Sequence, residues 1–198
     1  MAHNSWTHKL ARLAIRPLLG TRVTPNHLTT ARLLTGIAAC LLFALGTRGG
    51  EIWGGLMWVI SAFLDRADGE LARIGDMRSA RGHAYDYASD VVCNGLVFVA
   101  FGIGLRDGPV GWWSIAMGII AGVTVVAASL WSEKLERRLE NGSKAYEGAG
   151  GFDFDDVLYV FGPVAWLDWL WPLLIGASIG GPVFALITLV RLRQADAI

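Results

Sequence analysis

Charged side chains are scarce in this chain of 198 residues, because Asp, Glu, Lys and Arg together make up only 17% of it. Soluble domains contain about 25% charged and about 45–50% apolar residues. Here 54% of the residues are hydrophobic and the mean hydropathy is +0.45, so a water-soluble enzyme is not expected. The 17 basic and 17 acidic residues cancel. This balance argues against a nucleic-acid partner and against an acidic disordered tail.

Cysteines and short catalytic motifs are also nearly absent. The two cysteines, Cys40 and Cys93, both lie in apolar runs, so neither a disulfide framework nor a Cys-x-x-Cys metal site is available. The sequence contains no P-loop, no nucleophile elbow and no internal repeat. Residues 1–24 lack the continuous apolar core of a signal peptide and are not expected to act as one.

Long apolar stretches are what the sequence has in abundance. Each has roughly the length that crosses about 30 Å of hydrocarbon, and they cover residues 27–47, 52–74, 83–105, 110–132, 155–170 and 172–191. The sequence therefore predicts an all-α integral membrane protein, a six-helix bundle over residues 27–191. We expect residues 1–198 to form a single domain.

Residues 1–24 have a different pattern, in which Lys and Arg alternate with apolar residues. The apolar positions are Trp6, Leu10, Leu13 and Leu18. This pattern predicts a basic amphipathic helix on the cytoplasmic membrane surface. A frayed polar terminus is the alternative interpretation.

The distribution of basic residues predicts the orientation of the bundle. With the N-terminus inside, only Arg48 and Arg106 of the 17 Lys and Arg residues fall at outer ends, and cytoplasmic loops are expected to carry such an excess. Tryptophans, which favour the headgroup region, gather near the predicted outer ends at positions 53, 112, 113, 166, 169 and 171. Both termini are therefore expected in the cytoplasm, at a bacterial or archaeal inner membrane.

Four aspartates interrupt the second and third apolar stretches. Asp65 and Asp68 are three residues apart, and Asp86 and Asp90 are four apart, so each pair lies on one face of its helix. A short turn joins the two helices, which places both pairs near the same cytoplasmic end. Ionisable residues at such depth are costly and are candidates for function. The alternatives are a proton or cation pathway and structural ion pairs.

Converging carboxylates repel each other unless cations lie between them, and all-oxygen ligation favours Mg²⁺ or Mn²⁺. A site for one or two metal ions is the natural solution. Gly69 and Ala72 follow Asp68 on nearly the same helix face, and Gly82 precedes Asp86 by one turn. These small residues leave room for a ligand beside the acids. Arg73 lies about a turn nearer the cytoplasm, where its planar cation is well placed to meet a phosphate.

The segment from Asp65 to Asp90 reads D-x2-D-G-x2-A-R-x8-G-x3-D-x3-D. It resembles the signature of the CDP-alcohol phosphotransferase family at all eight specified positions, which makes a specific motif. The segment that begins at Pro25-Asn26 and includes Leu28, Thr29 and Arg32 is similar to the start of that family's first membrane helix. The six-helix plan and the N-terminal amphipathic helix also resemble the family over nearly the whole chain.

The resemblance implies a reaction in which an acceptor hydroxyl attacks the β-phosphorus of a CDP-linked alcohol and CMP leaves. It implies catalytic roles for Asp86 and Asp90, with Asp90 as the general base, and two Mg²⁺ or Mn²⁺ ions as cofactors. The implied metal ligands are Asp65, Asp68, Asp86 and Asp90. The implied CDP pocket consists of Asn26, Thr29, Asp68, Gly69, Ala72, Arg73 and Gly82. The resemblance also implies a homodimer.

A basic group at the inner ends of the fourth and sixth stretches is a candidate site for a phosphorylated acceptor. Its members are Ser132, Lys134, Arg137, Arg138, Arg191 and Arg193. Ordinary positive-inside anchoring explains these residues equally well. Glycerol phosphate and inositol phosphate are the acceptors we expect, in phospholipid synthesis. CDP-diacylglycerol is the donor we expect, because a site beside the headgroups lets its acyl chains remain in lipid.

Three alternatives remain at this stage. The same acids would serve an enzyme with a soluble CDP-alcohol donor and a lipid acceptor. They would also serve an ion-coupled transporter or pair helices in a non-catalytic scaffold. A transporter needs polar positions that continue to the outer leaflet, whereas residues 96–105 are an apolar run.

Two further features have structural explanations. Asp153, Asp155 and Asp156 precede the fifth stretch, where acids are favoured as helix caps. The glycines at 49, 50, 54 and 55 are expected to serve tight turns and close packing rather than phosphate binding.

Overall fold

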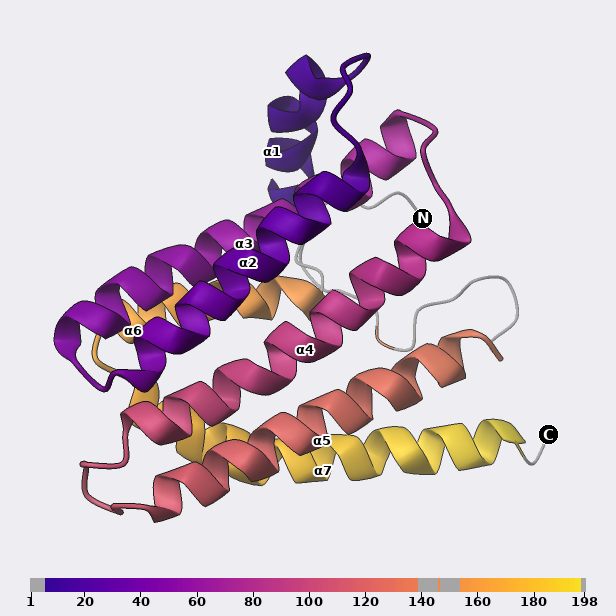
Figure 1. The fold of residues 1–198 in the computed structure, drawn as a ribbon. Coiled ribbons are helices and arrows are strands. Elements are labelled where there is room, and N and C mark those ends of the chain that lie inside the picture. Colours follow the sequence, from indigo (N-terminus) through magenta and orange to yellow (C-terminus); the bar gives the residue numbers. More distant parts are fainter. Residues whose placement is uncertain (1–5, 139–145, 147–153, 197–198) are drawn as a thin grey trace.

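The computed structural model describes residues 6–138, 146 and 154–196, and the regular elements among these residues are all helices. Five long helices lie side by side in one bundle (Figure 1). They are α2 (Pro25–Ala44), α3 (Arg48–Ile74), α4 (Ala80–Gly104), α5 (Trp113–Glu136) and α7 (Leu170–Asp196). The shorter elements are α1 (Trp6–Ile15), the 3₁₀ turns η1 (Arg16–Leu18) and η3 (Phe154–Val160), and α6 (Phe161–Trp166).

Four of these helices, α2, α4, α5 and α7, are long and apolar enough to cross a membrane. The prediction of six such helices is therefore not confirmed within the described residues. The stretch at 52–74 lies in α3, which is 27 residues long but contains seven charged residues. The stretch at 155–170 forms η3 and the six-residue α6 instead of one continuous helix.

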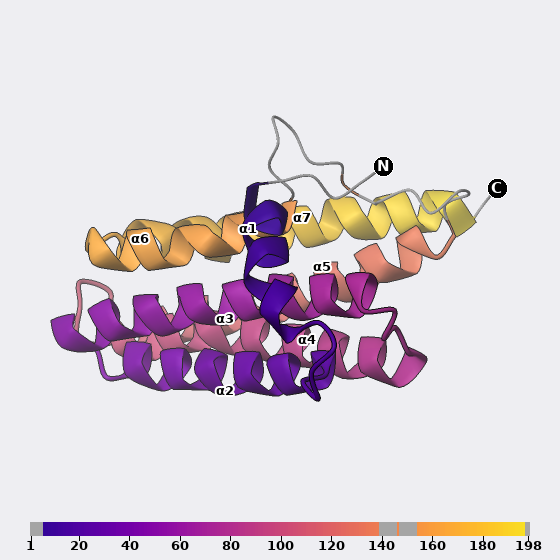
Figure 2. The same cartoon turned by 90° about the horizontal axis from the view of Figure 1, so that it is seen from above.

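α1 is shorter than the helix predicted over residues 1–24. It ends at Ile15, just before Pro17, whose ring nitrogen has no hydrogen to donate to a continuing helix. α1 lies across the bundle and packs on α3 (Figure 2). Thr7, His8 and Ala11 are buried, whereas Trp6, Leu10 and Leu13 are exposed. Its attachment to a membrane surface stays a prediction.

The turn between α3 and α4 is short because local signals end one helix and begin the next. Asp76 adopts a left-handed conformation with φ of 52°, and the backbone N–H of Met77 donates to the carbonyl of Ala72 over 3.0 Å. This arrangement closes the C-terminus of α3. The Ser79 hydroxyl then accepts from the N–H of Gly82 over 3.0 Å and caps α4. Both helices therefore meet at what we call the cavity end of the bundle, together with the start of α2.

The opposite end, where α2 and α4 terminate and α3 and α5 begin, holds a cluster of aromatic rings. The Phe101 ring lies 4.8 Å from that of Phe43 and 5.7 Å from that of Phe161, centroid to centroid. Gly46 turns the chain after α2 with φ of 65°, and a Cβ at Gly46 would collide with the carbonyl oxygen of Gly104. We call this the closed end, because backbones and rings fill it.

Candidate active site

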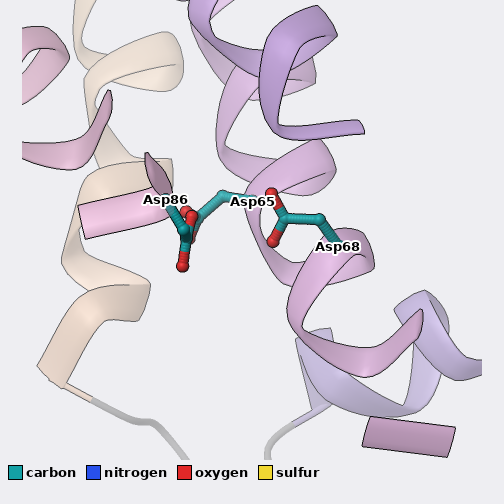
Figure 3. Close-up of side chains that lie close together, drawn as sticks. All are labelled: Asp65, Asp68 and Asp86. Atoms are coloured by element: carbon teal, nitrogen blue, oxygen red, sulfur yellow. The ribbon is translucent and has the colours of Figure 1, made fainter. Parts of the chain in front are cut away.

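Three carboxylates converge at the cavity end of the bundle. Asp65 and Asp68 come from α3 and Asp86 comes from α4, and Figure 3 shows the three side chains together. One oxygen from each lies within 4.8 Å of the others. The predicted convergence of these three acids is therefore present in the structure, and it follows from the i, i+3 spacing on α3 and the tight turn to α4.

Asp90, the fourth predicted acid, is not one of the three mutually close carboxylates and pairs with Arg32 of α2. The Arg32 guanidinium contacts Asp90 through Nη2, and its Nε lies 3.3 Å from Asp65 Oδ1. Arg32 is itself only 3% exposed. A buried cation thus joins the acid group to Asp90 and compensates part of their negative charge. Metal ligation by Asp90 and its role as a base stay predictions.

A cavity of about 260 Å³ opens beside the acids. Asp68 and Asp86 line it, and the other lining residues are Pro25, Asn26, Thr29, Gly69, Ala72, Met77, Arg78, Ser79, Gly82 and His83. The cavity is thus built from the start of α2, the end of α3 and the start of α4. Of the seven residues predicted for the CDP pocket, six line it.

Arg73 is the exception among the predicted pocket residues. Its Nη1 donates to Glu70 Oε1 over 2.7 Å, and it does not belong to the cavity wall. The i, i+3 spacing of the two residues on α3 accounts for the pair. Thr29 has a second contact besides the cavity, since its hydroxyl donates to Asp68 Oδ2 over 2.6 Å and so fixes that carboxylate.

Two observations show that the acid group fits a divalent cation. Asp68 Oδ1 and Asp86 Oδ1 are buried and have no hydrogen-bond partner among the described residues. Buried polar atoms are normally satisfied, and hard carboxylate oxygens are the ligands that Mg²⁺ and Mn²⁺ prefer. In addition, a Cβ at Gly69 would meet no atom within 4 Å, so this part of the wall leaves space for a ligand.

The residues predicted to bind an acceptor phosphate lie on α5 and α7, outside the cavity wall. Lys134 and Arg137 are exposed near the end of α5, and Arg137 pairs with Glu133. Arg191 lies over the Tyr146 ring at 5.2 Å from its centroid. Figure 1 shows that α5 and α7 both end at the same end of the bundle as the start of α4. The structure therefore brings these residues to the cavity end but not into the cavity.

Several residues of this end were not assigned to the donor pocket from the sequence. Met77, Arg78, Ser79 and His83 add a rim to the cavity. Their signal was their place in the turn between two helices that bear the acids. Glu70 is 1% exposed and pairs with Arg73. Its i, i+3 spacing to Arg73 was a signal that the sequence analysis did not use.

The acids predicted to cap the fifth stretch have a different role where the structure describes them. Asp156 is buried and pairs with Arg66 of α3 over 3.2 Å. It also accepts a hydrogen bond of 2.8 Å from the Thr7 hydroxyl of α1. Asp153 lies outside the described residues, and the side chain of Asp155 does too.

Comparison with known proteins gives four findings. The family model for CDP-alcohol phosphatidyltransferase matches residues 22–150. Among solved structures, phosphatidylinositol phosphate synthase (PgsA1) of Mycobacterium tuberculosis with CDP-DAG bound is similar, with a TM-score of 0.62, 20% identity and coverage of 97% of this chain and 92% of that one. The same enzyme with manganese and citrate has a TM-score of 0.61 and 20% identity, covering 96% and 87%. A search of curated protein sequences finds no match.

The likeness to the solved structures extends over nearly the whole bundle and shows a shared fold. The family match covers more than half of the chain and includes α2, α3, α4 and α5, and with them all four aspartates. It decides against the transporter and scaffold interpretations of these acids. The chain belongs to the CDP-alcohol phosphatidyltransferase family, and it is a membrane-associated transferase of substituted phosphate groups in phospholipid biosynthesis.

Proposed function

We propose that this protein transfers the phosphatidyl group of CDP-diacylglycerol to the hydroxyl of a phosphorylated polyol and releases CMP. The observation that carries the proposal is the group of three carboxylates from α3 and α4 beside the cavity. The printed name of one structural relative, which has CDP-DAG bound, supports the lipid donor. That relative is a phosphatidylinositol phosphate synthase, which supports inositol phosphate as the first acceptor to test.

Asp65, Asp68 and Asp86 would hold a divalent cation. We propose that the site takes two such ions and that Asp90 is a further ligand. The unpartnered oxygens of Asp68 and Asp86 support this assignment. The bound cations would supply neutralisation of the pyrophosphate and stabilisation of the departing CMP oxygen. The complex of a relative with manganese supports a divalent metal in this fold.

The residues of this chain have separate tasks in the transfer. Thr29 holds the Asp68 carboxylate in place through its 2.6 Å hydrogen bond. Gly69 leaves open space in the cavity wall for the donor's phosphates. Asp90 accepts the proton of the acceptor hydroxyl while that oxygen forms its bond to the β-phosphorus. The bond between this phosphorus and the CMP oxygen breaks, and the electron pair leaves with CMP.

Lys134, Arg137 and Arg191 would hold the acceptor's phosphate, with Ser132 as a neutral donor. Their common position at the cavity end supports this role (Figure 1). We further propose that residues 1–198 form one domain and that both termini face the cytoplasm of an inner membrane. The protein would act as a homodimer, which its mass in detergent would test.

The decisive experiment measures CMP release by purified protein in detergent. The donor is CDP-diacylglycerol with Mg²⁺ or Mn²⁺, and glycerol phosphate, inositol phosphate, inositol and serine are supplied separately. We expect CMP with one phosphorylated polyol and none after the metal is removed with a chelator. CMP with inositol or serine alone would contradict the proposed acceptor class.

A second donor separates the two enzyme interpretations. If CMP is released only with a soluble CDP-alcohol and a lipid acceptor, CDP-diacylglycerol is not the donor and the alternative enzyme interpretation is correct. No CMP with either donor, from protein with a cooperative thermal unfolding transition, would contradict the proposed reaction.

A further inference from the structure

A second buried acid, Glu70, lies two residues beyond Asp68 on α3. Glu70 is 1% exposed and belongs neither to the acid group nor to the cavity wall. Its carboxylate lies 2.7 Å from Arg73 Nη1, 2.7 Å from His8 Nδ1 and 3.5 Å from Arg12 Nε. His8 and Arg12 come from α1. The carboxylate is thus shared between α1 and an arginine of the family signature.

The contacts of His8 show which of its nitrogens faces Glu70 as a donor. Arg66 Nη1 lies 3.4 Å from His8 Nε2. A guanidinium group only donates hydrogen bonds, so Nε2 accepts and Nδ1 carries the hydrogen directed at Glu70. Arg66 is held in turn by Asp156 over 3.2 Å. α1 is therefore fixed to α3 by a buried polar network that ends at Arg73.

The other side of α1 presents Trp6, Leu10 and Leu13 to the surroundings, each with at least 47% exposure. An apolar face of this kind favours contact with lipid. The helix crosses α3 near the cavity end (Figure 2). The polar network therefore holds one side of α1 on α3, and the apolar residues leave its other side open to a lipid surface.

Arg73 lies next to the cavity along the chain, because it directly follows Ala72 of the cavity wall. Arg73 is 32% exposed at its side chain, so it is accessible to a ligand. One nitrogen of its guanidinium is bound by Glu70. A carboxylate and a phosphate are the two anions for which the arginine fork is best suited, so a phosphate that reaches Arg73 has to compete with Glu70.

We propose that Glu70 is a positioning residue that competes with the donor's phosphates for Arg73, and that α1 sets the strength of this competition through His8 and Arg12. The inference rests on the proposed function, since it requires a CDP-linked donor in the cavity. With both α1 residues in place, the charge of Glu70 is shared among three partners. Without them, Glu70 binds Arg73 more strongly. The negative charge of Glu70 is then compensated less completely, and it lies beside the site of an anionic donor.

The test uses variants of the full-length protein, with CDP-diacylglycerol as the probe. His8→Ala is expected to raise both the Kd and the KM for CDP-diacylglycerol about tenfold, with kcat changed less than about twofold. Adding Glu70→Gln to His8→Ala is expected to restore both values to near those of the wild type, since the competing charge is gone. A merely structural role of His8 predicts the opposite, because the double variant loses more buried contacts.

Lys9→Ala is the matched control, because Lys9 is an exposed cation on the same helix. We expect it to leave donor binding unchanged. Arg12→Gln is a milder second variant, since Arg12 is 36% exposed at its side chain. Arg12→Gln should raise the donor Kd about threefold. If His8→Ala does not fold, this variant is used for the test instead.

An unchanged donor Kd in both His8→Ala and Arg12→Gln would overturn the inference. So would a double variant whose donor binding is not restored, or an equal loss in Lys9→Ala. These outcomes, with an active wild-type protein, leave the proposed function intact. A folded wild-type protein that neither binds CDP-diacylglycerol nor releases CMP from it would remove the proposed function and this inference together.

Discussion

The two ends of the bundle use opposite means to hold the same helices together. At the closed end, rings and backbones meet directly, with Phe101 at the centre of the aromatic cluster and glycines at the closest approaches. At the cavity end, the same helices carry buried charges that are paired across elements. Arg32 contacts two aspartates, and Glu70 contacts residues of α1.

This difference shows where stability and function reside. Close packing of small and aromatic residues gains dispersion energy and leaves no space for a ligand. Paired buried charges contribute less to stability, because their desolvation offsets much of their attraction. They do leave unpartnered carboxylate oxygens and a cavity of about 260 Å³. We therefore expect substitutions at the cavity end to change activity and those at the closed end to change stability.

The largest effect is expected for Asp86→Asn. This change removes one of three converging charges, so CMP release should fall by at least about a thousandfold. CMP release and thermal unfolding in detergent would be measured together. Asp107→Asn is the matched control, since this acid near the closed end is 87% exposed at its side chain and should be replaceable without effect. Full activity of Asp86→Asn in a folded protein would remove Asp86 from the proposed chemistry.

The next effect concerns stability at the closed end. Gly104→Ala places a methyl group against the carbonyl oxygen of Phe43 and should lower the free energy of unfolding by about 2 kcal/mol, or about thirtyfold in the folded-to-unfolded ratio. Donor KM should stay as in the wild type. Gly49→Ala is the control, because a Cβ there meets no atom within 4 Å. Equal stability of both variants would mean that the closed end does not depend on this approach.

Gly69→Val tests the cavity end with a change that packing tolerates. A Cβ at Gly69 meets no atom within 4 Å, so the thermal unfolding midpoint should change little. The added side chain occupies the cavity and should raise the donor KM about tenfold. Gly176→Val on α7 has the same open surroundings away from the cavity and serves as the control. A normal donor KM for Gly69→Val would place the donor elsewhere.

The smallest effect is expected at the proposed acceptor group. Lys134→Ala removes one exposed cation and should raise the KM for a phosphorylated acceptor about threefold, since solvent-exposed charges interact weakly. The donor KM should not change. The comparison of glycerol phosphate with unphosphorylated glycerol in the same variant is the internal control. An equal change for both acceptors would contradict a phosphate contact at Lys134.

Much of the bundle could be predicted from the sequence, because hydropathy and helix-ending residues act locally. The stretches at 27–47, 83–105, 110–132 and 172–191 correspond to α2, α4, α5 and α7. The prediction of one helix at 155–170 was less accurate. There η3 and α6 divide the segment, and buried Asp156 pairs with Arg66 of α3, a partner 90 residues away that local patterns do not reveal.

In the candidate site, too, local features could be predicted from the sequence and contacts between distant residues could not. Spacing alone predicted that Asp65, Asp68 and Asp86 converge, because a turn of five residues joins their helices. Spacing did not reveal that Asp90 pairs with Arg32, because that partner lies on α2. Likewise, the position of Arg73 within the signature did not reveal that Glu70 binds its guanidinium.

The sequence by itself determined the apolar character of the protein, its four long apolar helices and the group of three acids, because hydropathy, helix periodicity and turn residues depend on neighbours along the chain. The tertiary structure decided which charges are paired and which remain available. Thr29, Arg32 and His8 each reach an acid on another helix. Those contacts depend on how α1 packs against α3 and how α2 packs against α3 and α4, and side-chain pairing over such sequence distances is fixed only when the helices are assembled.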